Sequence, residues 1–255
     1  MKVSIITAVF DRVDTISSAV SSVQSQRYEN VEHVIQDGGS KDGTLDKIRN
    51  KLTCSMKLVS EPDEGIYDAI NKGISRATGD IVGLMHSDDV FANQEVLSKV
   101  AALFNDPSLD GVYGDLEYVS SSNPAKVLRY WRAGDYSRSL LAKGWMPPHP
   151  TVYLRRQVFE KWGLYDTSFR IAGDYDALLR FLWVGRIRVA YLPEVLVRMR
   201  LGGESNASIR KIILKSHEDL RAIRRNKVGG LPVLLMIEVH RYQCPYILWS
   251  HLQHP

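Results

Sequence analysis

The stretch Gly83-Leu84-Met85-His86-Ser87-Asp88-Asp89-Val90-Phe91 joins an apolar run to two adjacent acids. The run from Ile81 to Met85 has the length of a buried strand. Asp88 and Asp89 at the carboxyl end of such a strand repel each other and are costly to desolvate, and a divalent cation would remove both costs. The alternative is a surface turn that caps a helix beginning near Gln94, because acids are common in turns.

The composition is that of a soluble globular protein. Hydrophobic residues make up 44% of the 255 residues and charged residues 24%, which is ample for a full core. The formal net charge of +4 is unevenly placed. Residues 1–197 hold 23 basic and 25 acidic side chains, whereas residues 198–255 hold 10 basic and 4 acidic ones. A basic tail of this kind indicates an anionic partner: membrane lipid, phosphate or nucleic acid.

The cysteines and the apolar runs exclude several classes of protein. Cys54 and Cys244 lie far apart and lack metal-ligand spacing, so we expect neither a disulfide framework nor a zinc site, which fits a reducing compartment. The apolar run after Lys2 is shorter than a signal peptide usually has. No apolar run reaches the roughly 18 residues of a spanning helix, so none is expected.

Short apolar runs alternate with helical patterns over the first 100 residues. Strands are expected at 2–10, 31–35, 56–60 and 80–88, with helices between them at about 13–23, 45–52 and 65–78. Connections of this length form βαβ units and therefore predict an α/β fold with a parallel sheet.

The second half mixes strands and helices. Strands are expected at 110–119, 126–132 (as a hairpin partner), 151–154, 188–192 and 195–201. Helices are expected at 157–162, from 175, at about 206–226 and at about 232–252, with a loop or short helix at 137–143.

Acidic and glycine-rich segments follow each of the first four expected strands. These segments are Phe10-Asp11, Asp37-Gly38-Gly39-Ser40, Glu61 to Glu64 and His86 to Asp89. In an open parallel sheet, ligands bind outside the carboxyl ends of the strands. We therefore expect these loops to converge on one ligand site at one edge of the sheet.

The acids of this edge suit transfer of a sugar from a nucleotide diphosphate. Such a reaction needs a divalent cation for the departing diphosphate and a carboxylate that takes the proton of the acceptor hydroxyl. Asp88 and Asp89 offer the hard oxygen ligands that Mg²⁺ or Mn²⁺ prefers. Asp37 can accept a hydrogen bond from a nucleobase N–H or a ribose hydroxyl, and Asp174 is the candidate base.

Six segments, in this order and spacing, resemble a family 2 glycosyltransferase with the GT-A fold, of the kind that builds bacterial O-antigen and exopolysaccharide. They are Thr7 to Arg12, Asp37 to Thr44, Glu61 to Gly73, Ala77 to Asp80, Ser87 to Asp89, and Gly173 to Asp176. The resemblance runs from the first strand to about Ser208. It implies a Rossmann-like, mostly parallel sheet flanked by helices, with a C-terminal helical extension.

The resemblance also implies roles for single residues. Thr7, Ala8 and Phe10 would line the nucleobase pocket, and Asp37 would read the base. Asp174 would be the catalytic base of an inverting, in-line displacement. Further nucleotide- or donor-binding positions would be Asp11, Gly38, Asp63, Tyr67, Asn71, Lys72, Ser87 and Asp88, and the cation, Mn²⁺ or Mg²⁺, would be held by Asp88 and Asp89.

Two positions depart from the family pattern. His86 stands where many members have an acid, which affects the metal preference. Gly173 replaces the first acid of a Glu-Asp pair, so Asp174 would act without that neighbour. Asp176 is the fallback base, although its place two residues into the helix predicts that it points elsewhere.

Several residues also have structural interpretations. Asp37 could start an Asx turn, and Asp174 could be an N-cap. His149, between prolines, either contacts acceptor or diphosphate or has a plain structural role. Arg198 and Arg200 share one strand face and either contact phosphate or form ion pairs with the acidic body.

The expected organisation is one GT-A domain at 1–205, with a nucleotide-binding half at 1–105 and an acceptor-binding half at 106–205. A C-terminal helical extension follows at 206–255, where basic residues precede an apolar, aromatic segment. This pattern suits an anionic membrane surface. The alternative is packing against the domain or against a second subunit in a homodimer.

We therefore predict a glycosyltransferase that moves a sugar from a nucleotide-diphosphate donor, with a UDP-sugar favoured, to a lipid-linked glycan. Its expected location is the bacterial cytoplasm, at the inner face of the inner membrane, with no nucleic-acid partner. One rival is a nucleotidyltransferase, but Phe10-Asp11-Arg12 replaces the glycine-rich basic loop expected there. The other rival is a non-catalytic scaffold with the same fold.

Overall fold

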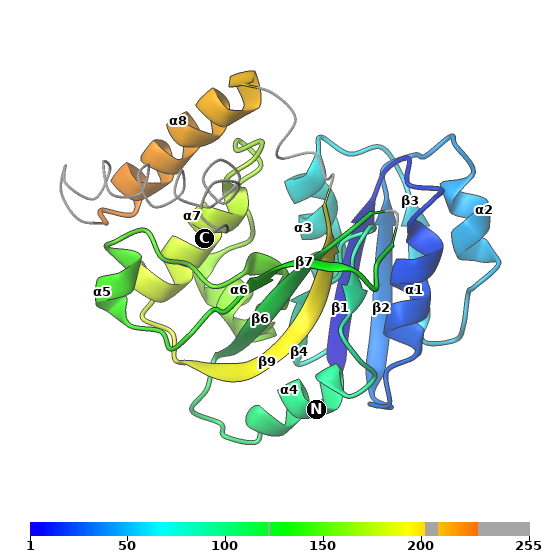
Figure 1. Cartoon of the computed structure of the whole chain (residues 1–255), viewed down its shortest axis with the longest axis horizontal. Coiled ribbons are helices and arrows are strands. Elements are labelled where there is room, and N and C mark those ends of the chain that lie inside the picture. The colour runs from blue at the N-terminus through cyan, green and yellow to red at the C-terminus, as the bar shows by residue number, and fades with distance from the viewer. Residues whose placement is uncertain (122, 202–208, 229–255) are drawn as a thin grey trace, which may run out of the picture.

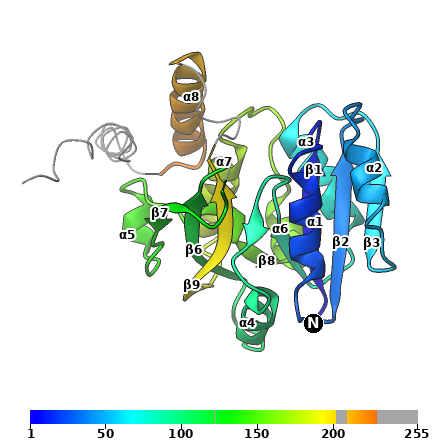
Figure 2. The same cartoon turned by 45° about the vertical axis from the view of Figure 1, so that its right-hand side comes forward.

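The protein forms three layers, with helices on both faces of one mixed sheet (Figures 1 and 2). A computed structural model describes residues 1–121, 123–201 and 209–228. The strands are β1 (Val3–Val9), β2 (Val31–Asp37), β3 (Met56–Ser60), β4 (Ile81–Leu84), β5 (Val90–Phe91), β6 (Gly111–Val119), β7 (Val127–Trp131), β8 (Tyr153–Arg155) and β9 (Val189–Arg200). The α/β alternation predicted for the first 100 residues is confirmed.

The helices complete the layers. They are α1 (Ile16–Gln24), α2 (Thr44–Arg49), α3 (Ile66–Arg76), α4 (Val96–Leu103), α5 (Arg138–Leu141), α6 (Arg156–Trp162), α7 (Gly173–Leu179) and α8 (Ile209–Arg225). A 3₁₀ turn, η1 (His149–Thr151), precedes β8, and a π-helical turn, η2 (Arg180–Val184), continues α7.

The sheet has the order β3-β2-β1-β4-β8-β6-β9-β5, with β7 paired to the outer part of β6. β1, β2, β3 and β4 are parallel, as βαβ units require. Beyond β4 the pairing turns antiparallel, through β8 to β6, while β6 and β9 run parallel. The parallel half therefore carries four strand ends at one edge, and the second half extends the same sheet.

Alternation along β1 shows why both faces are covered. Val3 and Ile5 pack with α1 and α4 on one face, while Ile6 and Ala8 pack with α3 and α7 on the other. All seven residues of β1 are buried. Such two-sided burial is typical of a parallel strand between helical layers.

One expected pair of strands is a single element. The strands predicted at 188–192 and 195–201 form the continuous β9, with a register shift at Pro193 and Glu194 opposite β6. A proline cannot donate a hydrogen bond to the sheet, so the pairing skips this position without ending the strand.

Helix α8 packs against the domain, which is one of the alternatives that the sequence left open for the tail. It lies against α7 in both views (Figures 1 and 2), and Ala222, Ile223 and Val228 are buried with α7 in one cluster. The helix expected at 232–252, and with it the predicted membrane or subunit contact, lies outside the described residues. Among the residues that the structure describes, no helix combines the length and apolar character needed to cross a bilayer.

Candidate active site

The site is built at the carboxyl ends of β1, β2 and β4. In the parallel register, Ile6 of β1 lies opposite Leu84 of β4, so the loops after the two strands leave the sheet side by side. Asp37 ends β2, next to β1. The predicted convergence of the strand-end segments on one edge therefore follows from the observed topology.

Asp37 is fully buried and anchors its own loop. Its carboxylate accepts hydrogen bonds from the backbone N–H groups of Gly39 (2.9 Å) and Ser40 (3.0 Å), from the Ser40 hydroxyl, and from the Ser60 hydroxyl of β3 (2.7 Å). This is the Asx-type turn that the sequence left as an alternative. The role of Asp37 in reading a base stays a prediction.

Three loops meet at Gly38. A Cβ on this residue would overlap the Asp63 carboxylate and would come within 3.2 Å of the Phe10 ring. Phe10 itself is 57% exposed, so its ring is open to a flat partner. We call Phe10, Gly38 and Asp63 the Gly38 cluster; an exposed ring beside carboxylate and backbone groups suits a nucleobase.

The neighbouring predicted donor residues hold the loops together. The Thr7 hydroxyl donates to the carbonyl oxygen of Met85 (2.8 Å), which ties β1 to the segment after β4. Asp11, in the left-handed region at φ 48°, accepts from the Lys41 N–H (2.9 Å). Ala8 and Ser87 are buried beside them. These contacts are structural, and nucleotide contact by these residues stays a prediction.

Two residues of α3 also make internal contacts. The side-chain amide of Asn71 bonds the backbone N–H (2.9 Å) and carbonyl (2.8 Å) of Tyr165, which fixes the loop before α7. The Lys72 ammonium pairs with Asp68 (2.9 Å) and donates to the carbonyl of Pro62 (2.9 Å). Both polar groups are thus engaged within the protein, and their contact with the nucleotide sugar stays a prediction.

The candidate base lies in the first turn of α7, where α3 and η1 approach it. The Tyr67 hydroxyl lies 3.3 Å from Asp174 Oδ1, and His149 Nδ1 lies 4.0 Å from Asp174 Oδ2. His149 Nε2 contacts the Tyr165 hydroxyl (2.9 Å), and the His149 ring lies 6.1 Å from the ring of His86 between centroids. Asp174 is thereby held beside the segment after β4.

Burial sets the protonation of these neighbours. Burial lowers the pKa of His149 to about 4, although the Asp174 carboxylate opposes the shift. Burial also lowers the pKa of His86, against the charges of Asp88 and Asp174. Burial, helped by Asp174, raises the pKa of Tyr67 far above its usual range. At neutral pH both imidazoles are therefore neutral, and Tyr67 keeps the proton that it donates.

Asp89 is buried with half of its carboxylate unpaired. Oδ1 accepts from the Arg200 N–H (3.2 Å), but Oδ2 finds no hydrogen-bond partner among the described residues. Burial and the charge of Asp88 raise the pKa of Asp89 well above its usual range. An orphaned buried carboxylate oxygen beside a second carboxylate fits a divalent cation. The described residues nevertheless bring together no three acids, histidines or cysteines that could enclose one.

The two arginines of β9 behave differently. Arg198 forms an ion pair with Glu117 of β6 (2.9 Å), which is the ion-pair alternative of the sequence interpretation. The Arg200 side chain donates to the Ser18 hydroxyl of α1 (3.0 Å), while its backbone N–H holds Asp89. Arg200 is thus the closer of the two to the strand-end acids.

Comparison with known proteins identifies the family of this site. The model of "Glycosyl transferase family 2" matches residues 4–171, which include every strand-end loop described above. The chain belongs to this family. It is a bacterial-type family 2 glycosyltransferase, and the resemblance found in the sequence is confirmed.

Relatives and solved structures agree with the assignment. The glycosyltransferase is 32% identical over 187 residues to an uncharacterized glycosyltransferase of Mycobacterium tuberculosis, covering 70% of this chain and 68% of the relative. It is 31% identical over 219 residues to a PGL/p-HBAD biosynthesis glycosyltransferase of the same species, covering 83% and 82%.

The solved structures confirm the GT-A fold. Staphylococcus aureus TarS 1-349 has a TM-score of 0.66 at 17% identity, over 100% of this chain and 76% of TarS. The mannosyltransferase PcManGT of Pyrobaculum calidifontis, solved with GDP-Man and Mn²⁺, has a TM-score of 0.66 at 18% identity, over 94% and 70%.

The structure leaves no room for a side chain at Gly173. A Cβ at this position of the glycosyltransferase would come within 2.7 Å of the Tyr67 ring. The fallback base does not reach the site: Asp176 is 1% exposed and accepts a hydrogen bond from Asn226 after α8 (2.9 Å). No sequence pattern singles out Tyr165, which contacts His149, or Glu218, which contacts the backbone before α7 from a distant helix.

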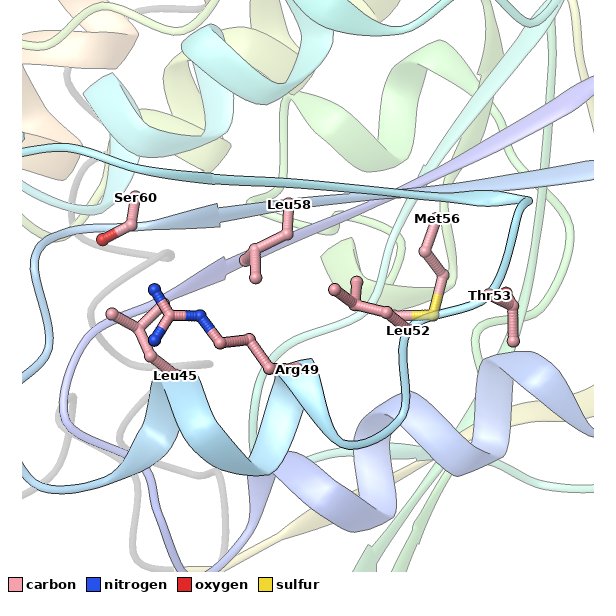
Figure 3. Close-up of a pocket in the computed structure, with 7 residues that line it drawn as sticks. All are labelled: Leu45, Arg49, Leu52, Thr53, Met56, Leu58 and Ser60. Atoms are coloured by element: carbon pink, nitrogen blue, oxygen red, sulfur yellow. The ribbon is translucent and has the colours of Figure 1, made fainter.

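Two hollows flank the site of the glycosyltransferase. A groove of about 470 Å³ lies between α2 and β3 (Figure 3) and is lined by Leu45, Arg49, Leu52, Thr53, Met56, Leu58 and Ser60. It touches the site only through Ser60, whose hydroxyl holds Asp37. A second hollow of about 520 Å³ lies between the start of α3 and residues 167–170, with Tyr67 in its wall.

Proposed function

We propose that the glycosyltransferase is inverting and moves a sugar from a nucleotide-diphosphate donor, with a UDP-sugar favoured, to a hydroxyl of a lipid-linked glycan in bacterial polysaccharide biosynthesis. The observation that carries the proposal is the placement of Asp174. Its carboxylate lies between Tyr67 and His149, beside the segment that bears Asp88 and Asp89. A carboxylate beside a diphosphate site is what in-line displacement at a sugar carbon requires.

Asp174 takes the proton of the acceptor hydroxyl as that oxygen bonds to the anomeric carbon. The bond from this carbon to the oxygen of the diphosphate breaks on the opposite face, so the configuration inverts. Neutral His149 and protonated Tyr67 leave Asp174 as the negative group nearest to the incoming hydroxyl. Asp176 is buried under α8 and stays outside the reaction.

The donor nucleotide would lie across the ends of β1 and β2. The Gly38 cluster offers an open ring at Phe10 and a backbone position where only glycine leaves Asp63 undisturbed. Asp37 organises this loop from within the core. TarS has been solved with UDP-GlcNAc and PcManGT with GDP-Man, so a test of the donor has to include both bases.

Asp88 and Asp89 would hold a divalent cation, Mn²⁺ or Mg²⁺. When bound, such a cation neutralises the charge that develops on the departing diphosphate. The unpaired Oδ2 of Asp89 supports this assignment. Diphosphate oxygens and water would complete the coordination, as is usual for Mg²⁺ sites.

The acceptor assignment rests on the second half of the chain and on its charge. We propose that residues 106–205 form the acceptor half and 1–105 the nucleotide half of the domain. The excess of basic residues after position 197 supports contact with an anionic membrane surface at the cytoplasmic face. However, Lys215 pairs with Asp219 and Arg225 with Asp166, so part of this charge is used within the domain.

Calorimetric titration with UDP and GDP, with and without Mn²⁺, tests the proposal. Binding that depends on the cation is expected, followed by slow hydrolysis of one donor in a panel of nucleotide sugars. Asp174→Asn should abolish transfer while it spares nucleotide binding. A scaffold would bind no nucleotide, a nucleotidyltransferase would release pyrophosphate from a nucleoside triphosphate, and retained transfer in D174N would remove Asp174 from the role of base.

Membrane contact has its own test. Flotation of the full chain with vesicles that contain anionic phosphatidylglycerol should exceed flotation with vesicles of phosphatidylcholine alone, and the difference should shrink in high salt. Equal flotation with both would leave packing against the domain or against a second subunit, and light scattering after size exclusion would distinguish a monomer from a homodimer.

A further inference from the structure

The carboxylate of Glu218 on α8 lies against the backbone that leads into α7. Oε1 accepts a hydrogen bond from the N–H of Arg170 (2.9 Å). Oε2 accepts from the N–H groups of Ile171 (2.8 Å) and Ala172 (2.9 Å). Glu218 is 5% exposed, so one buried side chain binds three successive backbone donors from a segment 46 to 48 residues earlier in the chain.

Of these donors, the N–H of Ala172 is buried, whereas the N–H groups of Arg170 and Ile171 are partly buried. Arg170 and Ile171 precede α7 and Ala172 is its N-cap residue, so these N–H groups have no acceptor within the helix, and the alanine side chain cannot cap it. A buried N–H without an acceptor costs about 1–3 kcal/mol. The carboxylate of Glu218 therefore supplies the acceptor, from a different helix, for the segment that enters α7, and its charge strengthens each bond.

The same segment is held from its other side by α3. The Tyr67 hydroxyl donates to the carbonyl oxygen of Ile171 (2.6 Å) and also lies 3.3 Å from Asp174 Oδ1. Residue 171 thus has its N–H fixed by Glu218 and its carbonyl fixed by Tyr67. Asp174 follows three residues later, and the intervening Gly173 packs against the Tyr67 ring.

Other side chains keep α8 in place along this segment. Arg221 donates to the Ser168 hydroxyl (2.5 Å), and its guanidinium lies 4.3 Å from the ring centroid of Phe169. Asn226, just after α8, donates to Asp176 on α7 (2.9 Å). The helix therefore contacts the chain both before and after Asp174.

We propose that Glu218 is a positioning residue for catalysis: from α8 it fixes the backbone of residues 170–172 and so the place of the Asp174 carboxylate. The inference rests on the proposed role of Asp174 as base. A displacement of about 1 Å at a reacting group can cost about 100-fold in rate without loss of substrate binding. In the part of the chain that the structure describes, Glu218 makes no hydrogen bond with Asp174, so it acts through this backbone.

The variant Glu218→Gln keeps the size of the side chain but turns an amide N–H₂ towards the backbone donors. We expect kcat to fall about 10- to 100-fold, whereas the KM for the donor and the affinity for UDP with Mn²⁺ stay within about twofold. Lys215→Gln is the matched control, because it removes a charge from the same helix at the pair with Asp219 and should leave kcat unchanged. Hydrogen exchange at the amides of 170–172 should accelerate in E218Q only.

A merely structural role would lower kcat and donor binding together, in proportion to the folded fraction, and this result would overturn the inference. Should E218Q fold poorly, Glu218→Asp, whose carboxylate is one methylene shorter, has to show the same selective loss of kcat. Wild-type kcat in E218Q with an inactive D174N would overturn this inference alone, whereas an active D174N would overturn the proposed base.

Discussion

The ring of Tyr67 lies directly against Gly173, the residue before the candidate base. A Cβ at position 173 would come within 2.7 Å of Tyr67 Cε2 and 2.9 Å of Cδ2 and Cζ. The family resemblance places the first acid of a Glu-Asp pair at this position. In this chain a tyrosine from α3 occupies that space and donates to the carbonyl of Ile171. In this structure an acid at position 173 would therefore collide with the Tyr67 ring.

Gly173→Ala should destabilise the protein and disturb transfer. The added methyl group meets a ring that is 7% exposed and held by its hydroxyl, so overpacking of about 1–3 kcal/mol is expected in urea unfolding. The double variant with Tyr67→Ala restores the space and should recover part of this stability, but not transfer, since the Tyr67 hydroxyl is lost as well. Additive losses in the double variant would contradict the packing explanation.

Asp89→Asn should weaken nucleotide binding only when the cation is present. The change removes the charge beside the unpaired Oδ2 while it keeps the size of the side chain. In calorimetry with UDP and Mn²⁺ we expect a loss of at least about tenfold, because even outer-shell partners of a metal are worth about 10–100-fold. The matched control is Asp80→Asn at the opposite end of β4, which holds the backbone of Lys2 (2.8 Å). Equal affinities for D89N and the wild type would discredit the cation site.

Gly38→Ala should impair nucleotide binding more than folding. The new methyl group would displace the Asp63 carboxylate, which is the movable end of a side chain, so unfolding should change by less than about 1 kcal/mol. UDP affinity should fall about tenfold, because the Gly38 cluster loses its shape. Combining Gly38→Ala with Asp63→Ala removes the carboxylate that the new methyl group of residue 38 would otherwise meet. If the single variant binds UDP normally, the cluster is not the nucleobase pocket.

The sequence predicted those parts of the site that depend on local pattern. Runs such as Ile81 to Met85 ending in acids predict parallel strands, and parallel topology alone gathers their ends. The contacts of Glu218 with Ala172 and of Tyr67 with Asp174 join residues 46 and 107 positions apart, and no period or spacing encodes such contacts. The sequence likewise left open whether Arg198 contacts phosphate or an acidic side chain. The register of β6 and β9 decides this, because it places Glu117 opposite Arg198.

The length of β9 shows a limit of another kind. Pro193 reads as a strand breaker, and the sequence therefore predicted two strands. The sheet tolerates it because β6 supplies pairing on both sides of the register shift. The pairing with β6 thus outweighs the preference of proline for a strand end. In the first half of the chain, the local sequence preferences and the sheet pairing agree.

The stability of the protein should fall as the pH drops below about 6.5, because the folded protein keeps two buried histidines neutral. His33 of β2 is 2% exposed, and burial lowers its pKa from 6.5 to about 3. Between these pH values the imidazole is protonated in the unfolded chain but neutral in the folded chain. The free energy of unfolding therefore falls by up to about 1.4 kcal/mol for each pH unit of acidification. His149, with a pKa lowered to about 4, adds to the same slope.

Glu32 extends this loss to lower pH. The net effect of its hydrogen bonds with Lys2, Ser4 and Thr78 holds its pKa well below the usual 4.5 despite burial. Its contribution is therefore complete above pH 4.5 and is lost below it. Urea unfolding at pH 7, 6 and 5 measures the contribution of the histidines to the pH dependence separately, because the contribution of Glu32 is constant above pH 4.5. His33→Gln, which keeps a polar partner for the Thr7 hydroxyl (2.9 Å in the wild type), should flatten the slope over that range. An unchanged slope in H33Q would show that the loss of stability comes from other groups.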